Sequence, residues 1–228
     1  MERYNLSVLS AAETTEYDPD LDPTMSFEFM TSSMRFGHSN IQSKMPLGKL
    51  GEQYLRDIFF QPFYLYDDSL DALISGFAKD KAQNMDTHVV QDMNEFCFRT
   101  SPYIPYGTDV TSLDINRGRL NGLPPYVDFL KLCTCRNVTS FEDLADIMPR
   151  KNLKRLKDTY RDVRDVDSLA GGMSEYPLEG GLMGPTFTCI LAEGMRRIKF
   201  GDRFYFEHGG QVGSFNTGAN ISISPLVY

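Results

Sequence analysis

The chain has 228 residues and a formal net charge of −8, so it is long enough for one domain with a sizeable core. Its acidic balance argues against nucleic acid or an anionic membrane surface as a partner, and no apolar run approaches the roughly 18 residues that span a bilayer. The first residues lack the charged region and apolar core of a signal peptide, so we expect no export address in this sequence.

Helical patterns dominate the sequence, and the first of them ends at a histidine. Phe27, Met30, Met34 and His38 recur at a spacing that places all four on one face of a helix. The next two predicted helices cover residues 52–60 and 69–78, and a third is marked by the spacing of Val89, Met93, Phe96 and Cys97. A capping box at 140–143 predicts a short helix over 144–148. The last is a long helix from Pro185 to Gly201.

Extended and loop signals are fewer than helical ones. Residues 204–206 and 221–227 are candidates for short strands, whereas 17–23, 100–108 and 171–184 have the composition of loops. The sequence therefore predicts a mainly α fold with long ordered connections, which is unusual for a self-contained helical bundle.

Two segments carry residues whose side chains could bind a metal or a charged ligand. Residues 33–39 read Ser-Met-Arg-Phe-Gly-His-Ser, which places Arg35 three residues before His38. Residues 113–118 read Leu-Asp-Ile-Asn-Arg-Gly and supply Asp114 and Arg117. An imidazole can ligate iron, a carboxylate can orient that imidazole, and guanidinium groups can pair with propionates. Together these are the parts needed to hold a haem from one side.

Each of these residues also has a purely structural interpretation. A histidine on a Phe/Met face, such as His38, is more often a satisfied core residue than a ligand. Asp114 is equally compatible with a turn or cap, and Arg117 with a solvated charge. Only the combination of the residues points to a binding site.

The cysteines and glycosylation sequons bear on the compartment. Three sequons, at Asn5, Asn137 and Asn220, are a mild indication of secretion. Among the four cysteines, Cys133 and Cys135 have no second pair at zinc-finger spacing, and the three histidines are scattered. A structural zinc site is therefore not expected.

The amino-acid sequences of residues 33–39 and 113–118 resemble motifs of the animal haem peroxidase family. Residues 35–39 resemble the motif around its proximal iron ligand, and 113–119, followed by 122–126, resemble its most recognisable signature. Further agreement lies, in order, at 17–23, 59–62, 166–172, 184–190 and 201–207. The resemblance covers most of residues 1–218, whereas 219–228 form a divergent tail. It implies a mainly α, peroxidase-like domain that is incomplete at both ends and represents the C-terminal, proximal half.

The resemblance implies a role for each residue of the two chemical segments. His38 would ligate the haem iron on its proximal side, and Asp114 would accept a hydrogen bond from the other ring nitrogen of His38. The family carries Asn or Asp at this place. Arg35 and Arg117 would pair with the haem propionates, which suits the planar guanidinium group.

Further implications concern the walls of the site and the reaction. Phe59, Phe60 and Leu113 would wall the proximal pocket, although plain core packing is compatible with the same positions. Cys133 and Cys189 match a family disulfide, which would imply an oxidising, extracellular compartment. The cofactor would be haem b, and the partners would be hydrogen peroxide and an electron donor such as a halide, a phenol or a tyrosine.

Departures from the family keep other functions open. The family's distal histidine, distal arginine, bound calcium and haem-esterifying acids would all align before residue 1. Leu120 and Asn121 replace the usual Asp-His pair, and the segment between His38 and Phe59 is several residues shorter. The alternative to a peroxidase is a catalytically inactive, truncated haem-binding or interaction module. A third interpretation is a helical structural domain without a cofactor.

Overall fold

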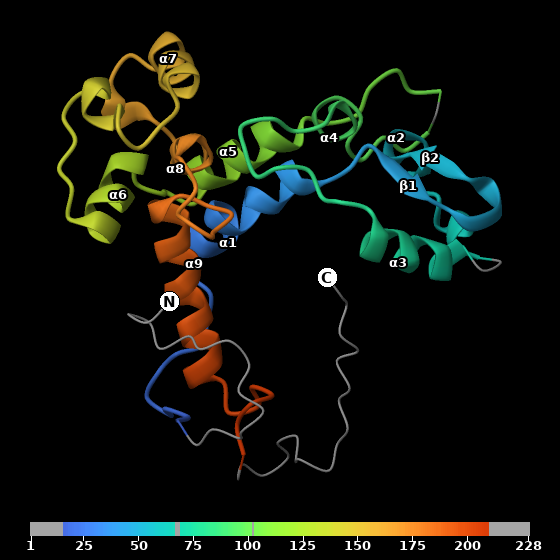
Figure 1. Ribbon diagram of the computed structural model, residues 1–228, viewed down its shortest axis with the longest axis horizontal. Helices are drawn as coiled ribbons and strands as arrows, with labels where there is room; N and C mark the ends of the chain where they lie inside the picture. The colour runs from blue at the N-terminus through green and yellow to red at the C-terminus, as the bar shows by residue number, and fades with distance from the viewer. Residues whose placement is uncertain (1–15, 67–68, 102, 210–228) are drawn as a thin grey trace.

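The α5 helix links two groups of elements in the computed structural model, which describes residues 16–66, 69–101 and 103–209 (Figure 1). The α6, α7 and α8 helices gather on one side of α5, and β1, β2, α2 and α3 gather on the other. The α-helices are α1 Phe27–Thr31, α2 Leu55–Ile58, α3 Ser69–Lys79, α4 Gln91–Asn94, α5 Val110–Leu120, α6 Tyr126–Thr134, α7 Arg150–Thr159, α8 Ser168–Ser174 and α9 Pro185–Gly201. The described chain is mainly helical, which confirms the predicted fold class.

Short 3₁₀ helices and one hairpin complete the described elements. The 3₁₀ helices are η2 Ser33–Asn40, η3 Gly48–Leu50, η4 Pro62–Leu65, η5 Phe141–Leu144 and η6 Val163–Asp165, and the strands are β1 Lys44–Pro46 and β2 Glu52–Tyr54. The two strands pair antiparallel, with Lys44 opposite Tyr54 and Pro46 opposite Glu52. None of the described helices is long and apolar enough to cross a membrane.

Helices whose ends are marked in the sequence by capping residues, proline or glycine were predicted well. The α3 helix confirms the prediction over 69–78, and α9 begins at Pro185 and ends at Gly201 as predicted. The capping turn is present, because Ser140 donates its backbone N–H to the Asp143 carboxylate at 2.9 Å. It opens the short η5 helix, however, and the predicted helix over 144–148 does not form.

Several predicted helices are wrong where a neighbouring segment offers a better partner. Residues 52–54 pair with 44–46 across a turn that closes at Gly51 (φ +67°), which leaves only α2 of the helix predicted over 52–60. The helix marked by Val89 and Cys97 shrinks to α4, because Cys97 forms a bridge to Thr108 and Phe98 takes φ +58°.

Two predictions outside helices are also wrong. Residues 204 and 206 lie in turns rather than in a strand. The loop predicted over 171–184 begins inside α8, which continues to Ser174. The predicted strand at 221–227 and the divergent tail at 219–228 lie outside the described residues.

The predicted helical face through His38 is broken at Ser32. The backbone of Ser32 (φ −126°, ψ −82°) ends α1 and starts η2, so the two helices do not share one continuous face. Phe27, Met30 and Met34 are 59%, 47% and 50% exposed. The prediction of one helical face carrying all four residues is therefore wrong, and these three side chains lie largely at the surface.

Glycines let α8 pack closely against two neighbours. A Cβ atom on Gly171 would lie 2.1 Å from the ring of Tyr126 on α6, and one on Gly172 would lie 2.1 Å from the ring of Phe187 on α9. Both distances are far below van der Waals contact, so any side chain would push the helices apart. The α6, α8 and α9 helices thus form a tightly packed frame.

A disulfide ties the same frame together. Cys133 of α6 and Cys189 of α9 are bonded, with their Cα atoms 5.8 Å apart, which confirms the predicted pairing. The other two cysteines are free: Cys97 is buried and Cys135 is exposed.

A buried carboxyl group joins the start of α9 to α6. Glu175 accepts hydrogen bonds from the Tyr126 hydroxyl (2.7 Å), the Thr186 hydroxyl (2.5 Å) and the Thr186 backbone N–H (3.0 Å). Only 7% of Glu175 is exposed, and this burial raises the pKa of its carboxyl group above the ordinary 4.5, although its three donors oppose the shift.

Removal of the disulfide is expected to destabilise the fold strongly. The bond closes a loop across a sequence separation of 56 residues, so its loss should lower the free energy of unfolding by about 4 kcal/mol in the chain-entropy model. Denaturant unfolding of Cys133→Ser/Cys189→Ser measures the loss. Cys135→Ser, which removes only an exposed free thiol, is the control and should change little. Equal stabilities of the two variants would contradict a structural role for the bond.

Stability should fall as the pH rises through the raised pKa of Glu175. The folded state holds this proton more tightly than the unfolded state, so its contribution is complete below pH 4.5 and is lost above the folded pKa. The slope cannot exceed about 1.4 kcal/mol per pH unit. Glu175→Gln, which is neutral at every pH, should remove this slope from unfolding free energies measured between pH 4 and 8. The exposed Glu179→Gln should retain it.

Candidate functional site

The centre of the candidate site is a contact between His38 of η2 and Asp114 of α5. The Nδ1 atom of His38 lies 2.5 Å from Oδ2 of Asp114, although 76 positions separate the two residues in sequence. A carboxylate can only accept, so the imidazole donates its Nδ1–H. Nε2 then becomes the ring nitrogen with a free lone pair, and within the described ranges it makes no hydrogen bond.

Local helix geometry explains why two side chains of η2 reach the same carboxylate. In a 3₁₀ helix, side chains three residues apart eclipse one another, so Arg35 and His38 project in the same direction. Asp114 meets them because α5 turns Val110 and Asp114 inward, one helical turn apart. Asp109 caps the start of α5 by accepting from two backbone N–H groups, which fixes this register.

Two guanidinium groups offset the burial of the Asp114 charge. Asp114 is 1% exposed. Arg117 donates from Nη1 to its Oδ1 atom at 3.1 Å, and Nε of Arg35 lies 3.8 Å from the same oxygen. Nε of Arg35 also donates to the carbonyl of Met30 at 2.8 Å. Most N–H groups of both arginines make no hydrogen bond to the part of the chain that the structure describes, so they remain available to an anion.

A pocket of about 300 Å³ opens beside this cluster. Arg35, His38 and Asp114 line it together with residues of α7 and α8 and with Asp86, Thr87 and Val89. The lining residues from α7, from α8 and from the segment just after α7 are Asn152, Arg155, Leu156, Thr159, Tyr160, Leu169, Ala170, Met173 and Ser174. The pocket therefore combines an imidazole and cations with apolar side chains, as a flat apolar ligand with acidic groups would require.

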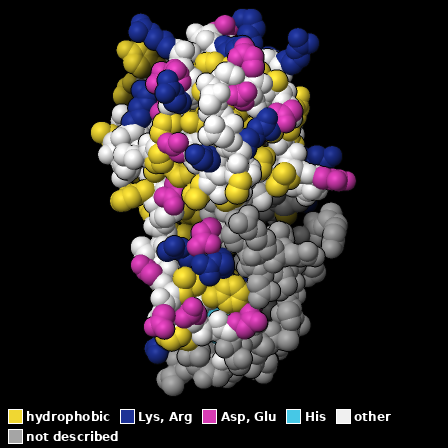
Figure 2. All heavy atoms as spheres, turned by 90° about the vertical axis from the view of Figure 1, so that its left-hand side faces the viewer, with side chains coloured by type: hydrophobic (Ala, Val, Ile, Leu, Met, Phe, Trp, Pro, Cys, Tyr) yellow, Lys and Arg dark blue, Asp and Glu magenta, His cyan; other side chains and the backbone are white. Residues whose placement is uncertain are grey.

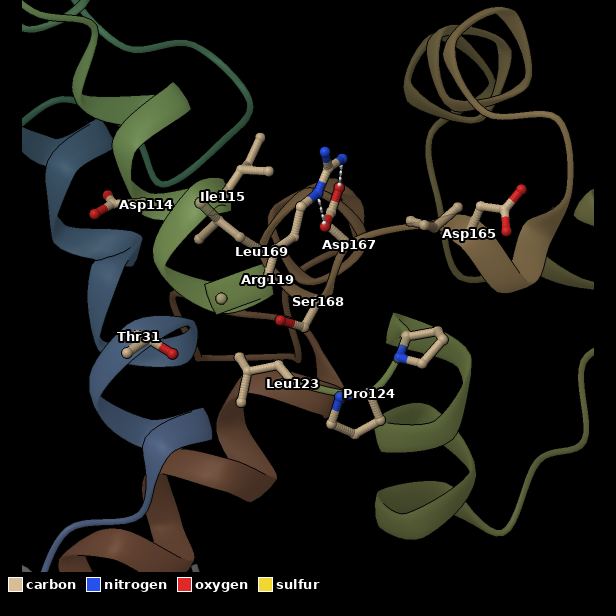
Figure 3. Close-up of a pocket in the computed structure, with 13 residues that line it drawn as sticks. Thr31, Asp114, Ile115, Arg119, Leu123, Pro124, Asp165, Asp167, Ser168 and Leu169 are labelled. Atoms are coloured by element: carbon tan, nitrogen blue, oxygen red, sulfur yellow. Dashed lines mark hydrogen bonds and ion pairs between the residues drawn. The ribbon is translucent and has the colours of Figure 1, made fainter. Parts of the chain in front are cut away.

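A second, smaller cavity of about 120 Å³ also reaches Asp114 (Figure 3). Three polar side chains that line it, those of Arg119, Asp167 and Ser168, already have partners. Arg119 donates to both oxygens of Asp167 at 2.9 and 2.7 Å, and the Tyr160 hydroxyl donates to the same carboxylate at 2.8 Å. Ser168 donates to the hydroxyl of Ser32 at 2.9 Å, which ties α8 to the junction of α1 and η2. This cavity is structural rather than a place for a large ligand.

The three predicted wall residues lie outside the pocket that contains His38. Phe59 packs against the cluster of Met93, Cys97 and Val110, and it lines a separate hollow beside η2. Phe60 is 60% exposed, with its ring 6.2 Å from that of Phe98. Leu113 is half-buried on α5. Their role as walls of a haem pocket stays a prediction.

Sequence reasoning missed the wall that α7 contributes to the pocket. Arg155, Thr159 and Tyr160 face the same space as His38 but were not singled out. A signal was present, because Leu153 and Leu156 recur three residues apart in a lysine- and arginine-rich segment that follows Pro149. That pattern identifies a helix, but its distance from 33–39 in sequence gives no hint of a shared site.

Truncation of Asp114 should change the tautomer of His38. With Asp114→Ala nothing holds the proton on Nδ1, so the neutral ring should shift toward the Nε2–H form. The ¹⁵N chemical shifts of the ring, recorded at alkaline pH, report this change. Asp86→Ala is the matched control, since Asp86 lies 3.3 Å from Nδ1 of the exposed His88. Unchanged His38 shifts in Asp114→Ala would show that the carboxylate does not orient the ring.

Comparison with known proteins identifies the family. The family model "Animal haem peroxidase" matches residues 1–224. The chain is 34% identical over 212 residues to a Drosophila melanogaster "Peroxidase", covering 90% of this chain and 30% of that protein. It is 32% identical over 228 residues to the Drosophila melanogaster "Chorion peroxidase", covering 95% of this chain and 27% of the relative.

A solved structure agrees with this assignment. "Peroxidase A from Dictyostelium discoideum" superposes with a TM-score of 0.75 at 30% identity, over 86% of this chain and 38% of that one. The chain thus spans about a third of the length of the relatives that it matches. A match of this extent, together with a histidine–carboxylate pair at the predicted positions, shows that the chain belongs to the animal haem peroxidase family.

Proposed function

We propose that this chain forms the proximal half of a haem site in a peroxidase that oxidises electron donors with hydrogen peroxide. The observation that carries the proposal is the hydrogen bond between Nδ1 of His38 and the buried Asp114 carboxylate. Metal-binding histidines typically donate their second ring N–H to a carboxylate or carbonyl, which fixes the tautomer and leaves the other nitrogen for the metal. In this chain that other nitrogen is Nε2 of His38.

The residues around His38 fit haem b, iron protoporphyrin IX, as the cofactor. His38 would be the axial ligand, and its side chain is a quarter exposed, so the ring edge is accessible. Arg35 and Arg117 would bind the propionates, because their side chains are 31% and 40% exposed and retain free N–H groups. When bound, the haem supplies the redox-active iron that reacts with peroxide.

Asp114 contributes to the chemistry as a positioning residue. By accepting a hydrogen bond from Nδ1–H, its carboxylate orients the ring and would increase the electron density at Nε2, which strengthens the lone-pair donor that the ring offers to iron. Burial makes this interaction stronger than it would be in water. The two arginines offset the cost of burying the carboxylate, so the orientation does not depend on a bound ligand.

The remaining assignments follow from the family and from the disulfide. Phe59, Phe60 and Leu113 would form apolar walls on the proximal side. The electron donor would be a halide, a phenol or a tyrosine, and the protein would take part in the response to oxidative stress. We place the protein outside the cell, because a disulfide such as Cys133–Cys189 persists in oxidising compartments.

A second candidate is a haem-binding or interaction module without peroxide turnover. Peroxide cleavage needs a general base and a cation on the distal side of the haem. Neither of the other histidines lines the pocket beside His38: His88 is exposed near Asp86, and His208 is buried with Nε2 at 2.6 Å from the carbonyl of Lys199. The described residues therefore supply a proximal side without an identified distal partner.

Titration of the chain with haem tests the proposal. The Soret band should shift and saturate at one haem per chain, and His38→Ala should weaken binding by at least about tenfold, since it removes the iron ligand. His88→Ala, which alters an exposed histidine that does not itself line the pocket, is the matched control and should bind as the wild type does. Stoichiometric binding by His38→Ala with an unchanged spectrum would exclude His38 as the ligand.

Peroxide-dependent oxidation of a phenolic donor by the loaded chain separates the two candidates. Turnover that His38→Ala abolishes and His88→Ala preserves would support a peroxidase. Haem binding without turnover would favour the second candidate. Turnover that survives in His38→Ala would trace to haem outside the proposed site.

A further inference from the structure

The connection between α6 and η5 carries one of the three sequons, and the proposed function makes no use of it. Residues 137–139 read Asn-Val-Thr, which satisfies the acceptor pattern for N-linked glycosylation. Such a pattern also arises by chance, so its structural setting decides whether it can be used. We propose that Asn137 is an N-glycosylation site, modified on its side-chain amide nitrogen.

Exposure alternates along the sequon in the way that an acceptor requires. Asn137 and Thr139 are exposed, whereas Val138 between them is 7% exposed and belongs to the core cluster around Tyr126 and Leu144. In an extended segment, side chains two residues apart lie on the same side. Asn137 and Thr139 therefore both lie at the surface of the folded chain, and a glycan on Asn137 would project into solvent.

Anchors on both sides of Asn137 hold it outward. Arg136 donates to both oxygens of Asp146 at 2.8 and 2.6 Å, and Val138 is fixed in the core. Cys135 ends α6 in the left-handed conformation (φ +59°), which turns the chain away from the helix. The side chain of Asn137 itself makes no hydrogen bond within the described parts of the chain. A glycan there would break no described hydrogen bond.

The surrounding surface has room for a large hydrophilic group. The connection that leaves α6 runs along the outer edge of the helical part of the molecule (Figure 1). Figure 2 looks onto that side and shows acidic, basic and apolar side chains interspersed across it. Such a mixed surface is compatible with a solvated glycan. The apolar Leu132, which is 76% exposed, lies five residues before Asn137.

The disulfide links the sequon to the compartment in which glycans are attached. Cys133 lies four residues before Asn137 and is bonded to Cys189, so the segment matures in an oxidising compartment. The inference rests here on the extracellular location that we propose, but not on haem binding or peroxidase activity.

The reaction is a group transfer that needs no oxidant. The Nδ2 atom of Asn137 attacks the anomeric carbon of an oligosaccharide that is linked to a lipid diphosphate. A C–N bond forms, the C–O bond to the diphosphate breaks, and the lipid diphosphate leaves while one amide proton passes to a base of the transferase. The product is an amide-linked glycan on an otherwise unchanged backbone.

The order of folding steps is compatible with this transfer. In the folded chain, the Thr139 hydroxyl donates to the Asp143 carboxylate at 3.1 Å, and its backbone N–H donates to the same group at 2.9 Å. The hydroxyl is thus engaged once the capping turn closes. Cys189 lies 56 residues after Cys133, so a growing chain exposes the sequon before the disulfide can form. We expect the transfer in that interval.

Site-resolved mass spectrometry tests the inference. The full chain is expressed behind a signal peptide in insect cells with Asn5→Gln and Asn220→Gln, so that Asn137 is the remaining acceptor. A glycosidase that converts glycosylated Asn into Asp is applied in ¹⁸O water, and the peptide containing 137 is examined in both the secreted and the cellular fractions. We expect ¹⁸O-labelled Asp at 137 and a mobility shift of one glycan on a gel.

Three variants separate glycosylation from effects on folding. Thr139→Ala should abolish the glycan, because it removes the hydroxyl of the acceptor pattern, whereas Thr139→Ser should retain it. Asp143→Ala disturbs the same capping turn but leaves the sequon complete, so it should also retain the glycan. An unmodified Asn137 in the cellular fraction would overturn the inference whatever the fate of the secreted chain. Haem titration of the same sample reports the proposed function independently.

Discussion

The buried carboxylate of Asp114 is the group on which the site depends. An isolated charge at 1% exposure would cost several kcal/mol, and it is sustained here by the ring of His38 and by two guanidinium groups. These partners come from two helices of different type. The η2 helix eclipses Arg35 and His38 because it has three residues per turn, and α5 places Arg117 one turn after Asp114. A change in either helical register would leave the charge uncompensated.

The position of η2 is set by packing that lies outside the site. Its start is tied to α8 by the hydrogen bond between the Ser168 and Ser32 hydroxyls, and it contacts α5, α8 and α9. The α8 helix is in turn fixed to α6 and α9 by the glycines at 171 and 172, and α6 and α9 share the disulfide. The histidine is therefore oriented by a rigid frame rather than by a ligand, which is what a preorganised binding site requires.

How much of this was predictable from sequence differs between elements for a physical reason. The α9 helix was predicted because Pro185 and Gly201 mark its ends and apolar residues repeat between them. The α5 helix was not predicted, because the residue that it turns inward beside Val110 is Asp114, and an inward carboxylate defeats hydrophobic periodicity. The pairing of His38 with Asp114 was expected only through the family resemblance, since no local pattern links residues 76 positions apart.

An apolar repeat also misled the prediction of one helical face through Phe27, Met30 and Met34, because the helix breaks at Ser32. Their spacing indicates a face suited to burial, yet the described residues provide nothing that covers it. The two arginines that balance Asp114 show a related property, because most of their N–H groups have no partner among the described residues and can accept an additional anion as one. In the structure, Arg35 and Arg117 balance the negative charge of the Asp114 carboxylate. In the haem complex that we propose, the same two groups would be shared between Asp114 and the propionates. The electrostatic balance that stabilises the buried carboxylate would thus also suit the proposed cofactor.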